Sequence, residues 1–399
     1  MKKFVRMYAI FAAAIMVLNF VGCSNSSGSS SAPTQTTTGG GTGTDNGEGQ
    51  QTGGGNGNEQ TTEPASGEYK KVDTVTINGT SYDIVTFGLW PQTIKADSVT
   101  VDTNVNEHHG AFTYCKGSDG EWYVKQAEKA YGNDYKYSDG TTTVGQGGTS
   151  EKWFKVEPIK WRVLATNYGG AKLLLAESIL TGGVPYYLNT SSRTIGGATV
   201  YANNYKYSTI RAWLNGAYEA DDTQDKTHAG KGFLQSAFTA AQQAAIKTTT
   251  VDNSARSTNP DANATQWNSG ENQYASDTPT SDKIFLLSEK EVTASAYGFA
   301  AYDSYGAGNK RIRVTTDFAK ATGAYQNSNA GLGGWWWRRS PSCYSDHSAR
   351  SVYHNGDAIN RSNVDYNYGG LRRLCPLRIS RRPSFLRPCA FILGAVIYG

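Results

Sequence analysis

Apolar and polar residues are distributed along the chain in a way that separates four segments. Residues 1–23 begin with basic side chains and continue into an apolar stretch shorter than the ~20 residues of a membrane-spanning helix, which is typical of an export signal. Residues 24–67 are so rich in Ser, Thr, Gly, Asn and Gln that we expect a disordered linker. Short apolar stretches recur over residues 68–380 and predict one folded domain. Residues 381–399 form a tail that is either an added strand or a segment without a role.

Apolar residues between turn signals predict short β-strands in the folded domain. The predicted strands are Val75–Ile77, Tyr82–Phe87, Trp122–Lys125, Trp153–Val156, Trp161–Thr166, Lys172–Ala176 and Lys283–Leu287. Between the first two strands, Asn78-Gly79 is typical of a two-residue type I′ hairpin turn. The three consecutive leucines of Lys172–Ala176 predict a central strand of a sheet.

Helical signals are few and short. The predicted helices are Ser208–Asn215, Lys231–Ile246, a short helix that begins at Ser288 with a capping-box pattern, and Thr316–Thr322. Residues 252–279 are polar and predict a long surface loop. The fold class is therefore α+β, with short twisted antiparallel strands, a few short helices and long loops.

Composition narrows the function classes. The net charge of +4 comes from charges of both signs spread along the chain, so we expect no nucleic-acid partner. The five cysteines form no CxxC motif, and no catalytic Ser/His/Asp order, paired-carboxylate motif or phosphate loop stands out. The adjacent His108 and His109 lack the spacing of a metal site. We expect no enzymatic activity, no metal and no cofactor.

The stretch from Gly334 to Ser380 differs from the rest of the domain. It opens with three tryptophans, which form either a carbohydrate-stacking platform or, as we favour, core packing. Arg338 and Arg339 follow and either bind anions or pair with carboxylates. Small polar residues and tyrosines then fill the stretch, with Val352, Ile359 and Val364 expected to pack beneath them. Tyrosine with Ser, Asn and Asp is the composition of antibody-like binding loops.

Several motifs occur in one order along the domain: FGLWPQ, KWRVL, STIRAWLN, KIFLLSEKEV, WWWRRSPS and a GGLRRLCPL close. Together they resemble an uncharacterised domain family of bacterial surface proteins with a WWLRSP signature. The C-terminal half also resembles a C-type-lectin-like fold, as in formylglycine-generating-enzyme relatives. The layout of the whole chain is similar to spirochaete variable lipoproteins diversified by a retroelement. In the N-terminal segment, Phe20-Val21-Gly22-Cys23 resembles a lipobox, which implies lipidation of Cys23; the alternative is an ordinary secretory signal.

The resemblance to diversified lipoproteins implies a retroelement that mutates adenines in a C-terminal repeat. AAY codons altered in this way become NNY codons, which never encode Lys, Gln, Glu, Met or Trp. None of these residues occurs between Ser340 and Gly370. The resemblance therefore implies a variable ligand-binding surface within residues 340–370. The alternative is an invariant polar loop of biased composition.

The function that these observations predict is a lipid-anchored receptor or adhesin at the bacterial cell surface or outer membrane. Its partners are the membrane, through Cys23, and a protein or carbohydrate ligand on another cell or host surface. The expected ligand contacts are Tyr344, Ser345, Asp346, His347, Arg350, Tyr353, His354, Asn355, Asp357, Asn360, Ser362, Asn363, Asp365, Tyr366, Asn367 and Tyr368.

Two alternatives belong to other classes. One is an exported oxidase of the formylglycine-generating type that uses Cys343 and Cys375. The other is an envelope structural lipoprotein without a variable surface. An oxidising compartment also allows a disulfide among Cys115, Cys343, Cys375 and Cys389, whose connectivity the sequence does not give.

Overall fold

The computed structural model describes residues 67–145, 147–258, 272–276, 278–301 and 304–366, together with the backbone of residues 394–397. The predicted export signal with Cys23, nearly all of the predicted linker, and the predicted contacts Asn367 and Tyr368 lie outside the described residues. Cys375 and Cys389 lie outside them as well.

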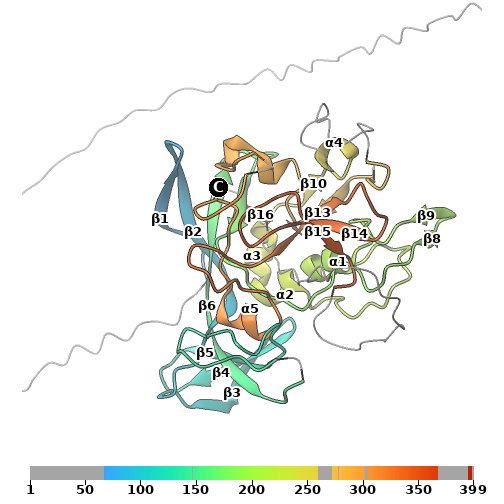
Figure 1. Ribbon diagram of the computed structural model, residues 1–399. Helices are drawn as coiled ribbons and strands as arrows, with labels where there is room; N and C mark the ends of the chain where they lie inside the picture. Colours follow the sequence, from blue (N-terminus) through green and yellow to red (C-terminus); the bar gives the residue numbers. More distant parts are fainter. Residues whose placement is uncertain are drawn as a thin grey trace, which may run out of the picture. The chain divides into compact units, whose positions relative to one another are not determined.

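A nine-stranded sheet dominates the described part of the chain (Figure 1). Its strands are β1 (Lys70–Ile77), β2 (Thr80–Ile94), β3 (Val101–His109), β4 (Phe112–Gly117), β5 (Trp122–Ala127), β6 (Glu151–Ala165), β7 (Lys172–Ala176), β12 (Ile284–Phe285) and β16 (Gly394–Ile397). The order is β12-β16-β7-β6-β5-β4-β3, with the β1–β2 hairpin joined through β2 to β6. All of these pairs are antiparallel.

Three smaller antiparallel sheets accompany the large one. They are β8 (Arg193–Ile195) with β9 (Ala198–Val200), β10 (Thr249–Val251) with β11 (Thr280–Asp282), and β13 (Trp336–Pro341) with β14 (Ser348–Val352) and β15 (Arg361–Asn363). The described helices are α1 (Thr209–Asn215), α2 (Phe233–Ala237), α3 (Ala240–Ala245), α4 (Ala255–Thr258), α5 (Asp317–Ala321) and the 3₁₀ turns η1 (Glu291–Thr293) and η2 (Ser295–Tyr297). Mainly antiparallel sheets with a few short helices agree with the α+β class. None of the described helices is long and apolar enough to cross a membrane.

The predicted hairpin is present as β1 and β2. Asn78 and Gly79 have φ angles of 50° and 80°, the left-handed values that a type I′ turn requires at its two central residues. β7 spans the predicted residues and lies between β6 and β16, with its three leucines fully buried, so its central position is confirmed. β16 lies in the C-terminal tail, so residues 394–397 form an added strand.

Two predictions about elements were wrong. The strands predicted on either side of Pro158 are one strand, β6, because it pairs in succession with β5, β2 and β7 and remains extended throughout. The helix predicted over Lys231–Ile246 is two helices, α2 and α3, separated at Phe238. The break occurs because Thr239 accepts a hydrogen bond from Gln242 N and starts a new helix with a capping box.

The core packs against the C-terminal sheet formed by β13, β14 and β15. Trp336 and Trp337 are fully buried and Trp335 is nearly so, which confirms that the tryptophans are core residues. Trp336 Nε1 donates to the carbonyl of Arg311, and Tyr186 packs on Trp337 and donates to the carbonyl of Arg339. These bonds satisfy the polar atoms of Trp336 and Tyr186, whereas Trp337 Nε1 is buried without a hydrogen-bond partner among the described residues.

Candidate functional site

The predicted variable surface is carried on β13, β14 and β15 and on the loops between them. Every residue of β13 and β14 is buried, so both faces of this strand pair are covered. The side chains available to a ligand therefore come from three segments: the β13–β14 turn, the β14–β15 loop, and β15 with the residues that follow it. A rigid strand pair beneath exposed loops is the arrangement that a binding surface requires.

Arg338 and Glu289 form a fully buried ion pair at the centre of this region. Arg338 Nη1 lies 2.5 Å from Glu289 Oε2, and both side chains are inaccessible to solvent. The guanidinium of Arg350, also buried, lies 3.8 Å from the same carboxylate oxygen. Burial lowers the pKa of Arg338, and the Glu289 carboxylate acts in the opposite direction. The ion pair joins residues 288–291, here called the SEKE segment, to β13, the first strand of the site. The two parts are distant in sequence.

The neighbouring Arg339 forms a second ion pair with Glu291, at 2.5 Å between Nη1 and Oε2. Arg339 also donates to the carbonyls of Leu286 and Asp252, and Tyr168 donates its hydroxyl proton to Glu291. The two arginines therefore pair with carboxylates, which decides between the two predicted roles. The helix expected at Ser288 is the 3₁₀ turn η1, and its capping box is present because Ser288 and Glu291 bond each other's backbone N–H groups.

Backbone carbonyls, not side chains, accept most of the described hydrogen bonds from the scaffold to residues 340–364. Donors from outside this range bind the carbonyls of Pro341, Ser345, Asp346, Ser348, Ser351, His354, Asn355, Gly356, Ala358, Asn360 and Val364. Arg338 supplies three of these bonds, to Ser351, Ala358 and Asn360, and Asn203 supplies the three to Ser345, Asp346 and Ser348. Every residue type has a carbonyl, so these contacts do not depend on which side chains the loops carry.

Arg311 is a further anchor that sequence reasoning missed. Its fully buried guanidinium donates to five backbone carbonyls, including that of Gly356 in the β14–β15 loop. Asn203 and Glu289 were missed as well. Their only sequence signal is a polar side chain beside buried aromatic or apolar residues, which does not reveal a partner more than 40 residues away.

Among the described residues, the expected ligand contacts fall into two groups. The exposed or half-exposed residues are Tyr344, Ser345, Asp346, His347, Tyr353, His354, Asn355, Asp357, Asn360, Asn363, Asp365 and Tyr366. Arg350 and Ser362 are buried, with 1% and 6% of their surfaces exposed, and the prediction that they contact a ligand was wrong. Arg350 is turned inward by Glu289 and by the carbonyl of Ile359.

Of the expected packing residues, Val352 and Val364 are fully buried, whereas Ile359 is half-buried. Cys343 has a free thiol in the β13–β14 turn, and its sulfur lies 3.6 Å from Arg350 Nη2. Cys115, the other cysteine among the described residues, is also free. Within the same part of the chain, no group of His, Cys, Asp or Glu side chains is arranged to hold a metal ion.

These observations define the class of protein. It is an antiparallel α+β domain whose C-terminal loops are held by hydrogen bonds to their backbone carbonyls. The family described as a domain of unknown function, DUF6273, matches residues 169–394, more than half of the chain. The chain therefore belongs to the DUF6273 family. No curated protein and no solved structure matches it.

We expect Arg338→Met to lower the free energy of unfolding by about 3–5 kcal/mol, because Glu289 then remains buried without its main partner. Hydrogen exchange should accelerate at residues 353–360, because Arg338 binds the carbonyls of Ser351, Ala358 and Asn360, at the two ends of this loop. The control is Lys71→Met, which breaks an exposed pair with Asp83 and should cost less than about 1 kcal/mol. Urea unfolding measures both variants, and equal effects would contradict the central role of Arg338.

The second ion pair, between Arg339 and Glu291, predicts that the free energy of unfolding depends on pH. Burial alone raises the pKa of Glu291, but Arg339, Ser288 and Tyr168 together hold this pKa below its ordinary value of 4.5. Since the folded-state pKa is the lower one, the carboxylate contributes stability that is present above pH 4.5 and lost as the pH falls through the folded-state pKa.

The free energy of unfolding should therefore fall on acidification below about pH 5, and Glu291→Gln should reduce the size of that fall. Urea titrations at several pH values provide the measurement. Glu151→Gln, which alters an exposed pair with Lys125, is the control and should leave the pH dependence unchanged. The same acid-induced fall in Glu291→Gln as in the native chain would show that this carboxylate does not cause it.

Proposed function

We propose that this protein is an exported, lipid-anchored receptor whose C-terminal surface binds a protein or glycan on another cell. The domain is proposed to be C-type-lectin-like, and residues 340–370 to be diversified by a retroelement. Cys23 would carry the anchor, and residues 24–67 would separate the domain from the membrane. No catalytic role is included in the proposal.

The observation that carries the proposal is the attachment of residues 340–364 through their carbonyl groups. A diversified surface needs a backbone that remains in place while its side chains change. Donors such as Arg338, Arg311 and Asn203 provide this, because replacement of a neighbouring loop side chain removes none of their acceptors. An invariant structural lipoprotein would have no need for this separation.

The exposed side chains also suit recognition. Tyr344 is 56% exposed, and its ring lies 4.8 Å from the guanidinium carbon of Arg361. Asp346 and His347 form a half-exposed pair, with 2.6 Å between Oδ1 and Nδ1. Large aromatic rings beside small polar groups provide contact area at low entropy cost together with adaptable hydrogen bonds.

Side-chain replacement should be tolerated on this surface and costly just below it. We expect Tyr344→Ala to change the free energy of unfolding by less than about 1 kcal/mol, because more than half of the Tyr344 surface is exposed to solvent. Val352→Ala, in the fully buried β14, should cost about 2 kcal/mol. Thermal and urea unfolding of both variants provide the measurement. A loss in Tyr344→Ala as large as that in Val352→Ala would mean that the surface is part of the core.

Sequencing of the 3′ end of the gene across one clonal population tests diversification directly. Differences should occur at outward-facing positions such as Tyr344, His347 and Asn355, and spare the buried Arg350 and Ser362. Flanking DNA should contain a near-copy of the codons for residues 340–378, from which the variants differ only at adenines. One unvarying sequence with no such copy would refute diversification and leave an invariant surface.

A further inference from the structure

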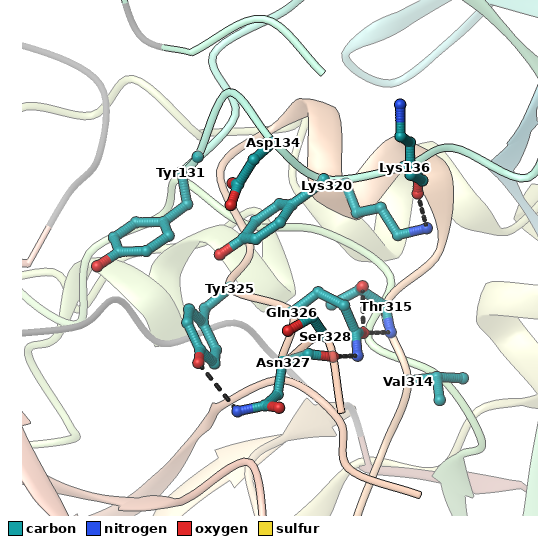
Figure 2. A pocket seen from close by; sticks show the side chains of 12 residues that line it. Tyr131, Asp134, Lys136, Val314, Thr315, Lys320, Tyr325, Gln326, Asn327 and Ser328 are labelled. Atoms are coloured by element: carbon teal, nitrogen blue, oxygen red, sulfur yellow. Dashed lines mark hydrogen bonds between the residues drawn. The ribbon is translucent and has the colours of Figure 1, made fainter. Parts of the chain in front are cut away.

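A pocket of about 710 Å³ opens outside the predicted variable surface (Figure 2). One wall is the loop of residues 131–136, which follows β5, and the other comprises residues on both sides of α5. Tyr131, Tyr135 and Tyr325 supply the aromatic lining, and the polar lining includes Asp134 and Asn327. A concave site with aromatic walls and a few polar groups is the usual form of a small-molecule site.

The three tyrosines are packed on one another in a fixed arrangement. The Tyr325 ring meets those of Tyr131 and Tyr135 edge-to-face, with centroids 5.5 Å and 6.3 Å away. Tyr325 is nearly buried at the base, whereas Tyr131 and Tyr135 are half-exposed. Rings in mutual contact leave no room between them for a quaternary ammonium ion, so the cluster does not form a cation cage. It instead presents flat aromatic faces to the pocket.

Most polar groups of the pocket are already engaged. Gln326 Oε1 accepts hydrogen bonds from the backbone N and the hydroxyl of Thr315, at 3.0 Å and 2.7 Å. Asn327 Nδ2 donates to the Tyr325 hydroxyl at 3.2 Å, and Lys320 Nζ donates to the carbonyl of Lys136 at 2.9 Å. These bonds fix the walls in place before any ligand binds, which lowers the entropy cost of binding.

Asp134 is the exception. Its side chain is exposed at the pocket, and among the described residues its carboxylate accepts no hydrogen bond and forms no ion pair. Of the two lysines in the lining, Lys320 pairs with Asp317 and Lys136 donates to the hydroxyl of Thr142, so neither is paired with Asp134. The Asp134 carboxylate beside the aromatic faces disfavours an anionic ligand, because like charges repel. It suits a ligand with several hydroxyl donors, since hydrogen bonds to a charged acceptor are the stronger ones.

The pocket adjoins the predicted variable surface through aromatic contacts. The Tyr325 ring lies 5.7 Å from that of Trp335 and 5.8 Å from that of His354, and Trp335 Nε1 donates to His354 Nδ1 at 3.1 Å. His354 is one of the expected ligand contacts. The ring at the base of the pocket therefore packs against a residue of the predicted variable surface.

We propose that this pocket binds one neutral pyranose unit of a glycan. The apolar C–H face of the sugar packs on Tyr131 and Tyr135, and its hydroxyl groups donate hydrogen bonds to the Asp134 carboxylate. The inference deepens the proposed function by choosing a glycan over a protein ligand, and it rests on that function in treating the chain as a receptor. It does not require the surface to vary.

The test uses the full chain and the methyl glycosides of glucose, galactose, mannose and N-acetylglucosamine as probes, with tetramethylammonium and inorganic phosphate for comparison. Saturation-transfer NMR detects binding and titration gives Kd. At least one glycoside should bind, and neither ion should.

Asp134→Asn should weaken the binding at least tenfold, whereas Asp97→Asn, at an exposed aspartate outside the pocket, should leave Kd unchanged. Tyr131→Ala should weaken it as well, with folding checked by circular dichroism.

Two outcomes would contradict the proposal that the pocket binds a sugar, and neither would contradict the receptor proposal. One is that no glycoside binds, or that an ion binds in its place. The other is glycoside binding that Tyr344→Ala abolishes and Asp134→Asn leaves intact, which would place the sugar on the predicted variable surface. Failure of diversification in the sequencing experiment, by contrast, would leave the pocket result unaffected.

Discussion

The buried ion pair between Arg338 and Glu289 is the interaction on which the rest of the C-terminal region depends. A guanidinium taken out of water loses several kcal/mol of hydration, and only an opposite charge with further acceptors compensates for it. Glu289 provides the charge and the carbonyls of Ser351, Ala358 and Asn360 provide the acceptors. The need to satisfy one cation therefore fixes the SEKE turn, the strand pair and the following loop relative to one another.

This arrangement separates the backbone of the loops from their side chains. Arg311 and Asn203 repeat the principle at other points, donating to carbonyls of the β14–β15 loop and of the β13–β14 turn. Most proteins fix binding loops partly through the loop side chains themselves, so that changes in specificity also change stability. Here the scaffold's bonds to the loop carbonyls are independent of the loop side chains, although Asn355 and Asp357 also accept hydrogen bonds from backbone N–H groups inside the β14–β15 loop.

The two proposed sites lie differently with respect to the family match. Residues 169–394 include Glu289, Glu291, Arg338 and Arg339, so the ion pairs that hold the C-terminal loops lie inside the matched domain. Tyr131 and Asp134 lie before it, in the segment that follows β5. The proposed sugar pocket is thus built where the matched domain meets the N-terminal strands, with Tyr325 supplied by the domain itself.

Local chemistry let the sequence determine the type I′ turn at Asn78-Gly79, the helix capped by Ser208 and the burial of the three tryptophans. Each follows from a few neighbouring residues or from the size of one apolar side chain. The tertiary structure alone decided that Arg350 points inward, that β6 continues through Pro158, and that Arg338 pairs with Glu289. Those outcomes depend on partners distant in sequence, because the charge, the pairing strand or the acceptor that stabilises each residue arrives only when the chain folds.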